Sequence, residues 1–225
     1  MNPSMSRPPE ALHHPHCRAT ASLIIQAAML VATWVGPCGP AAGWVLTISA
    51  GPKAAFLQVG IGSYSGVYNS GGTPLNNTQV NVVSVTVPAS AVGRGTAQAM
   101  TSNSTQSVSF YDNFAVCNPP SQVYIGGWVR TPTGTGTGVL SVASPANLTS
   151  GVNTIPFSQI SWTSTANGNA AANIPAGTFN GGTLALANFA RNTFVENCFT
   201  YRYANTIVAA AGTFTGRATF TLTTP

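Results

Sequence analysis

Apolar residues and threonines alternate over residues 213–223, near the end of this 225-residue chain. Phe214, Ala218, Phe220 and Leu222 fall on one side of the alternation, and threonines with Arg217 fall on the other. A period of two residues is that of a β-strand with one buried face, and threonine suits the exposed face. The pattern therefore predicts a half-buried strand at the C-terminus.

Shorter runs of the same kind fill the chain beyond residue 55, where no run has the apolar spacing of a helix. Clusters of Gly, Asn, Pro and Thr separate them, including residues 131–138, which we expect to form a long hairpin loop. Many short strands of this kind predict an all-β fold, a single antiparallel β-sandwich over residues 44–225. Only residues 89–99 are expected to contain a helical turn. The expected strands cover residues 56–61, 79–87, 107–111, 122–130, 138–143, 155–162, 183–189, 194–203 and 213–223.

Residues 1–43 have the organisation of a secretory signal peptide. They are polar and basic over residues 1–18, apolar over residues 19–35, and then rich in small residues and proline. We expect cleavage between residues 41 and 55, with an uncleaved membrane anchor or lipidation at Cys38 as alternatives. The predicted location is secreted, periplasmic or at the cell surface, with membrane contact only through this segment if it is retained.

Few side chains in the exported part can perform acid–base or metal chemistry. Charged residues make up 5% of the chain, and all three histidines precede residue 17. Ser–His–Asp catalysis and metal sites of several ligands therefore lack the residues they need, and we expect no catalysis, cofactor or metal. Asp112 and Glu196 leave a two-carboxylate hydrolase as the one enzymatic hypothesis, against the alternative that each carboxylate caps a turn or pairs with an arginine. The arginines are scattered along the sequence, so nucleic-acid binding is not expected.

Cys117 and Cys198 are the two cysteines beyond the predicted signal peptide. Two cysteines in an oxidising compartment usually pair, and a reactive thiol would have no histidine to activate it. We therefore predict a disulfide that closes a loop of about 80 residues and stabilises the fold by roughly 4.5 kcal/mol. The bridge would bring Asp112 and Glu196 into one neighbourhood.

Aromatic residues suggest a second kind of site. Tyr124 and Trp128 share one side of an expected strand, and Trp162 lies in another. Aromatic rings with polar groups can stack on sugars, so these three are candidate glycan contacts. The alternative is that they belong to the core, which a β-sandwich also needs.

Residues 210–223 (AAGTFTGRATFTLT) resemble the final strand of bacterial chaperone–usher pilins and of spore-coat-U-like secreted proteins. Those families end in a Pro/Ala-Ala-Gly-Thr-aromatic turn followed by an alternating strand, and residues 174–179 resemble the same turn. The resemblance implies an incomplete immunoglobulin-like sandwich that a strand from a neighbour completes by β-augmentation. The donated strand would come from the region of residues 56–61.

These observations lead us to expect an exported, non-catalytic structural or adhesive surface protein, a pilin-like or coat-like subunit. The expected strand-pairing or subunit contacts are Phe214, Ala218, Phe220 and Leu222. The expected partners are copies of the same chain, a periplasmic chaperone or surface glycans. The alternative function is that of a self-contained secreted carbohydrate-binding module or adhesin.

Overall fold

The C-terminal alternation forms a strand, β16, in the computed structural model, which describes residues 45–77, 79–166 and 172–224. Within these ranges there is no α-helix, and the strand pairings are antiparallel, so the predicted all-β fold is confirmed. The predicted signal peptide lies outside the described residues. The elements in chain order are β1 (Val45–Thr47), β2 (Ala54–Val59), β3 (Tyr64–Ser65), the 3-10 helix η1 (Tyr68–Ser70), β4 (Thr73–Pro74), β5 (Val83–Ser84), η2 (Ala89–Ala91), β6 (Gln98–Ala99), β7 (Thr101–Ser102), β8 (Val123–Arg130), β9 (Thr137–Ala143), β10 (Asn147–Ser150), β11 (Asn153–Pro156), η3 (Phe157–Gln159), β12 (Ile160–Thr165), β13 (Gly177–Thr178), β14 (Thr183–Ala190), β15 (Thr193–Tyr203) and β16 (Thr219–Thr223).

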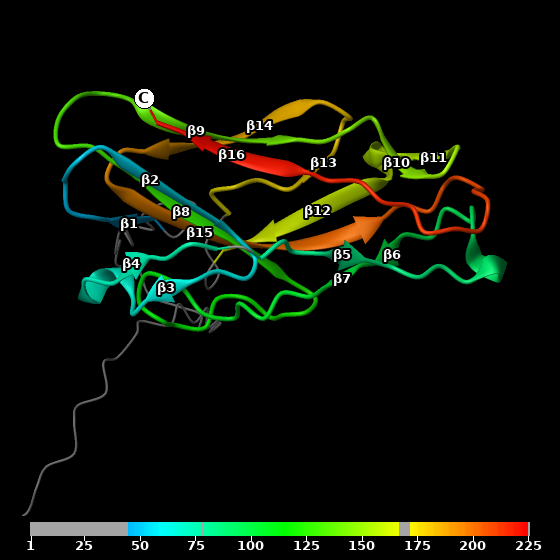
Figure 1. Cartoon of the computed structure of the whole chain (residues 1–225), viewed down its shortest axis with the longest axis horizontal. Coiled ribbons are helices and arrows are strands. Elements are labelled where there is room, and N and C mark those ends of the chain that lie inside the picture. Colours follow the sequence, from blue (N-terminus) through cyan, green and yellow to red (C-terminus); the bar gives the residue numbers. More distant parts are fainter. Residues whose placement is uncertain (1–44, 78, 167–171, 225) are drawn as a thin grey trace, which may run out of the picture. The chain divides into compact units, whose positions relative to one another are not determined.

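The larger sheet is built around β15, in the order β13-β12-β15-β8-β2 (Figure 1). The first half of β15 pairs with β8 and β1, and its second half pairs with β12 and β6. Because both edges of β15 are paired and both of its faces are covered, its residues 194–199 are buried without interruption. The neighbouring strand β8 is buried on both faces in the same way.

A smaller sheet of order β14-β9-β16 packs on one face of the larger sheet. Leu140 and Val142 of β9 and Phe189 of β14 meet Val129 of β8 and Phe199 of β15 in one hydrophobic cluster. All five side chains are at most 1% exposed. Their burial, at roughly 1.5–3 kcal/mol for a large apolar side chain, is the main force that holds the two sheets together.

Loops cover the other face of the larger sheet, where a second and mostly aromatic cluster forms. Phe56, Tyr124, Trp128 and Phe194 project from β2, β8 and β15, and Phe110 packs on them from the segment before Cys117. Several of these rings meet edge to face, an arrangement that favours aromatic pairs.

Four predicted elements differ from the observed ones. Of residues 79–87 only β5 joins a ladder, and residues 107–111 contribute a single bridge at Val108. The run over residues 155–162 is divided by η3. The C-terminal ladder covers Thr219–Thr223 alone, because Thr215 instead pairs with Thr149 of the β10–β11 hairpin. A pattern of alternation shows which residues face the core but not whether a partner strand lies alongside.

The expected long hairpin loop also proves to be a different connection. Residues 131–136 join β8 of the larger sheet to β9 of the smaller sheet, and these two strands do not pair with each other. The loop therefore crosses from one layer to the other at the end of the sheets (Figure 1).

Candidate functional site

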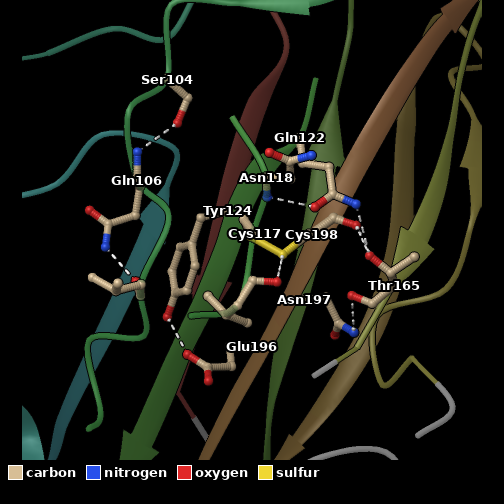
Figure 2. Close-up of a disulfide and its surroundings, with 12 residues drawn as sticks. Ser104, Gln106, Cys117, Asn118, Gln122, Tyr124, Thr165, Glu196, Asn197 and Cys198 are labelled. Atoms are coloured by element: carbon tan, nitrogen blue, oxygen red, sulfur yellow. Dashed lines mark hydrogen bonds between the residues drawn. A yellow bond between two sulfur atoms is a disulfide. The ribbon is translucent and has the colours of Figure 1, made fainter. Parts of the chain in front are cut away.

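The predicted disulfide between Cys117 and Cys198 is confirmed (Figure 2). It joins the middle of β15 to the segment that carries Phe110 over the aromatic cluster, and both cysteines are buried. The nearby side chain of Gln122 accepts a hydrogen bond from the Asn118 backbone N–H at 2.8 Å and donates one to the Thr165 hydroxyl at 3.3 Å. A disulfide of this kind is typical of an oxidising, extracytoplasmic compartment.

Glu196 lies in β15 two residues before the bridge and is only 1% exposed. The Tyr124 hydroxyl donates a hydrogen bond to its carboxylate at 3.0 Å (Figure 2). Burial raises the pKa of Glu196, hydrogen bonds from Ser109 and Tyr124 lower it, and the charge of Asp112 raises it further. Asp112 therefore lies within electrostatic reach of Glu196, as the disulfide prediction implied.

The two carboxylates nevertheless have structural partners. Asp112 accepts a hydrogen bond from the backbone N–H of Phe114 at 3.1 Å and so caps a turn. Glu196 is buried and bonded to Tyr124, whose ring packs edge to face against Phe110 in the aromatic cluster. This geometry favours the turn-capping alternative for Asp112 over a hydrolytic pair.

The four candidate strand-pairing residues all face the core without being enclosed by it. Phe214, Ala218, Phe220 and Leu222 are each half-buried and pack against the cluster between the sheets. Phe220 and Leu222 lie in β16, opposite Val142 and Leu140 of β9. Phe214 and Ala218 precede the strand, so only two of the four are part of the ladder.

β16 is an edge strand. It pairs with β9 on one side, and no other backbone among the described residues pairs with Thr219–Thr223. Its neighbour on the open side is β2, the edge strand of the larger sheet, which contacts β16 without pairing to it. Leu57 and Val59 of β2 are also half-buried and pack against the same cluster. The open side between the two sheets is therefore lined by apolar side chains that remain partly accessible.

Three other edge strands of the two larger sheets, β2, β13 and β14, are each protected in a different way. At the end of β2, the side-chain amide of Asn81 donates to the Val59 carbonyl and accepts from the Ile61 N–H at 2.8 Å, in place of a neighbouring strand. β14 is interrupted by a bulge between Ala185 and Ala187, and β13 has only two residues. Side-chain caps, bulges and short strands all discourage pairing with foreign strands. In the described chain, β16 carries no cap, bulge, proline or charge within its bounds.

The three candidate glycan contacts are interior residues. Tyr124, Trp128 and Trp162 are 0%, 5% and 3% exposed. The indole N–H of Trp162 donates to the Pro175 carbonyl at 2.9 Å, and its ring stacks on Phe199. None of the three offers an open ring face on which a sugar could stack, so the structure supports the core alternative for them.

Sequence reasoning missed two parts of this region. The pattern of residues 56–61 suggested a donated strand, but residues 54–59 form β2 within the larger sheet, in register with β8. Asn81 was not recognised as an edge cap, and no local signal would have found it because its partners lie about 20 residues away.

The described residues contain no group of three or more His, Cys, Asp or Glu side chains placed to hold a metal ion. Nor does this part of the chain contain a helix that is long and apolar enough to cross a membrane. No protein-family model, curated protein or solved structure matches the chain.

Proposed function

We propose that the protein is an exported, non-catalytic structural subunit of a cell surface, of the pilin-like or coat-like kind, that accepts an extended strand along the outer edge of β16. One observation carries this proposal. β16 has β9 on one side and no pairing partner in the described chain on the other, while Phe220 and Leu222 stay half-buried. A strand added there would pair the free backbone groups and bury both side chains.

Strand addition at β16 would be stabilised both by backbone pairing and by side-chain burial. An unprotected strand edge presents free N–H and C=O groups that a second strand can pair. Completing the burial of a half-exposed Phe or Leu adds about 1 kcal/mol for each side chain. Added together over a strand, such terms support specific β-augmentation, in which the backbone gives affinity and the side-chain pockets give selectivity.

The proposal includes the type of fold. We infer an immunoglobulin-like β-sandwich whose smaller sheet, β14-β9-β16, lacks a strand at its β16 edge. The half-buried Leu57 and Val59 on the facing edge of the larger sheet support this inference, because a missing strand leaves both borders of the gap partly open. The occupant of the gap would be a segment of another copy of the chain or of a periplasmic chaperone.

The surface composition also supports a subunit of an extracytoplasmic assembly. Only 5% of the residues are charged, whereas soluble domains use many mixed charges to stay apart. β16 exposes threonines on its outer face, which neither repel a second copy nor specify a charged partner. The Cys117–Cys198 bridge supports a secreted, periplasmic or cell-surface location.

The test compares two lysine substitutions that differ only in the face they occupy. Ala218→Lys places a charge on the half-buried side next to the open edge, and Thr219→Lys places the same charge on the exposed side. The proteins are exported from the full sequence and sized by light scattering across a range of concentrations. We expect the unmodified chain and Thr219→Lys to assemble, and Ala218→Lys to remain monomeric, because an inward lysine at an edge blocks strand pairing.

Circular dichroism and hydrogen exchange complete this experiment. Ala218→Lys must keep the β-sheet spectrum of the unmodified protein, and the amides of residues 219–223 should be slowed in assemblies relative to monomers. A folded wild-type monomer at every concentration, with no added protection of β16 by a chaperone or by a second copy, would refute the proposal.

A further inference from the structure

The side chain of Asn81 stands where a neighbouring strand would pair with the end of β2. Gly60, just beyond β2, donates its N–H to the Tyr124 carbonyl at 2.6 Å, so its N–H faces β8 and the larger sheet. Backbone groups alternate in direction along a strand, so those of Val59 face the open side. The Asn81 amide donates to the Val59 carbonyl and accepts from the Ile61 N–H at 2.8 Å. One side chain thus supplies both the donor and the acceptor of a peptide group.

The backbone around this cap is shaped to receive it. Gly60 has a φ of 68°, and a Cβ at this position would collide with the Asn81 side chain. Glycine adopts such a φ without strain and leaves the space that the amide fills. The Ile61 carbonyl in turn accepts hydrogen bonds from the side-chain amides of Gln58 at 2.6 Å and Asn77 at 2.7 Å. Three amide side chains therefore satisfy the end of this edge.

This cap depends on a single side chain, unlike the protection of the other edges. The bulge of β14 and the two-residue length of β13 belong to the backbone. β2 itself has a regular register with β8 and carries no charge or proline within its bounds. Its outward backbone groups are those of Ala55, Leu57 and Val59, and Asn81 bonds the last of them. Without Asn81 the whole length of β2 would be open to a further strand.

β2 and β16 border the same gap, so a cap on one of them bears on the choice between them. The two strands contact each other across the sheets (Figure 1). Both have half-buried apolar side chains, Leu57 and Val59 in β2 and Phe220 and Leu222 in β16, that pack on the cluster between the sheets. Side-chain burial therefore favours strand addition at either edge, and the main difference is that only β2 has an amide cap.

We propose that Asn81 determines which border of the gap accepts a strand: it closes β2, so that a second copy adds at β16 alone. The choice of β16 rests on the proposed function, whereas the closure of β2 by Asn81 is a separate claim. The partner for an opened β2 is β2 of a second copy. Two such strands would pair antiparallel about a two-fold axis, and neither carries a charge within its bounds that would repel the other.

Removal of Asn81 from a chain whose β16 edge is already blocked tests this inference. Asn81→Ala or Asn81→Ser is added to the full-length, disulfide-bonded Ala218→Lys protein and sized by light scattering. We expect Ala218→Lys alone to stay monomeric and both double variants to dimerise as the concentration rises. In the dimer the amides of residues 55–59 should be slowed in hydrogen exchange. In the dilute monomer the Ile61 amide should exchange roughly tenfold faster than in Ala218→Lys, because it has lost its acceptor.

Two further substitutions in the same background serve as matched controls. Asn77→Ala removes the same kind of side chain, but the Ile61 carbonyl keeps its bond to Gln58 and Asn81 stays in place. Asn81→Asp keeps an acceptor for the Ile61 N–H and places a charge at the edge, which discourages pairing. Both controls should remain monomeric.

The outcomes distinguish this inference from the proposed function. Double variants that keep the β-sheet circular dichroism spectrum but stay monomeric would overturn the inference, as would equal dimerisation of Asn77→Ala or slowed exchange outside residues 55–59. Loss of the β-sheet spectrum in both Asn81→Ala and Asn81→Ser would also overturn it, because the cap would then serve the fold rather than the choice of edge. If the proposed function alone were wrong, the unmodified chain would be monomeric while Asn81→Ala would still dimerise through β2.

Discussion

Removal of the Cys117–Cys198 disulfide by a double substitution to alanine should strongly destabilise the protein. The bridge connects β15, the central strand of the larger sheet, to the segment that closes the aromatic cluster, and the two cysteines are 81 residues apart in sequence. Without it the unfolded chain gains the entropy of an open loop, while the native contacts of the cluster remain available.

The size of the expected loss of stability follows from the length of the loop that the disulfide closes. For 81 residues, the chain-entropy relation gives a loss of about 4.5 kcal/mol in the free energy of unfolding. A domain of this size loses roughly 2–4 °C in melting temperature per kcal/mol, so the expected decrease is about 9–18 °C. Native domains are stable by only about 5–15 kcal/mol, so the variant would be close to the limit of folding.

Thermal unfolding followed by circular dichroism measures this decrease, and a reductant supplies the internal control. Reduction should lower the melting temperature of the unmodified protein toward that of the Cys117→Ala/Cys198→Ala variant, and should leave the variant unchanged. Hydrogen exchange should increase most in the segment around Phe110. A decrease of less than about 3 °C would refute the reasoning, since loop closure would then contribute little of what the relation assigns to it.

Three further predictions concern buried positions, and each is measured by denaturant or thermal unfolding. Burial raises the pKa of Glu196 in the folded state, so the stability that its protonation provides is present in acid and is lost as the pH rises through that pKa. Glu196→Gln should remove this pH dependence of stability, and a variant whose stability varies with pH as in the unmodified protein would contradict the argument. Gly127→Ala should cost about 1–3 kcal/mol, because a Cβ there would lie 2.1 Å from the Phe56 carbonyl oxygen; a neutral effect would show that β2 and β8 can separate freely. Trp162→Ala should cost about 3–5 kcal/mol through lost packing and the lost bond to Pro175, whereas a stable variant would mean that the ring is not part of the core.

Local sequence patterns were sufficient for much of the fold. The runs at 122–130, 138–143, 183–189 and 194–203 correspond to β8, β9, β14 and β15 within a few residues. These segments are long and strongly apolar or alternating, so burial and backbone pairing favour the same conformation. Alternation predicted strands less well where the inward face is only half-buried. Residues 79–87 alternate in this way, but only β5 within them joins a ladder.

Site prediction was limited for a physical reason. Whether an aromatic residue is a ligand platform or part of a core depends on what covers it, and the segment that covers Tyr124 and Trp128 is brought there by a disulfide between distant parts of the chain. In the same way, Asn81 lies about 20 residues from the backbone of β2 that it caps, so no local pattern in the sequence marks it as an edge cap.

The sequence by itself determined the local properties of this protein: an all-β chain, the pairing of Cys117 with Cys198, and the inward face of its last strand. These follow from side-chain periodicity and from which reactive groups are present. The tertiary structure alone decided which strand edge stays unpaired and which aromatic rings are enclosed. Those properties depend on strand order and register, which arise from contacts between residues far apart in the chain and leave no local trace in the sequence.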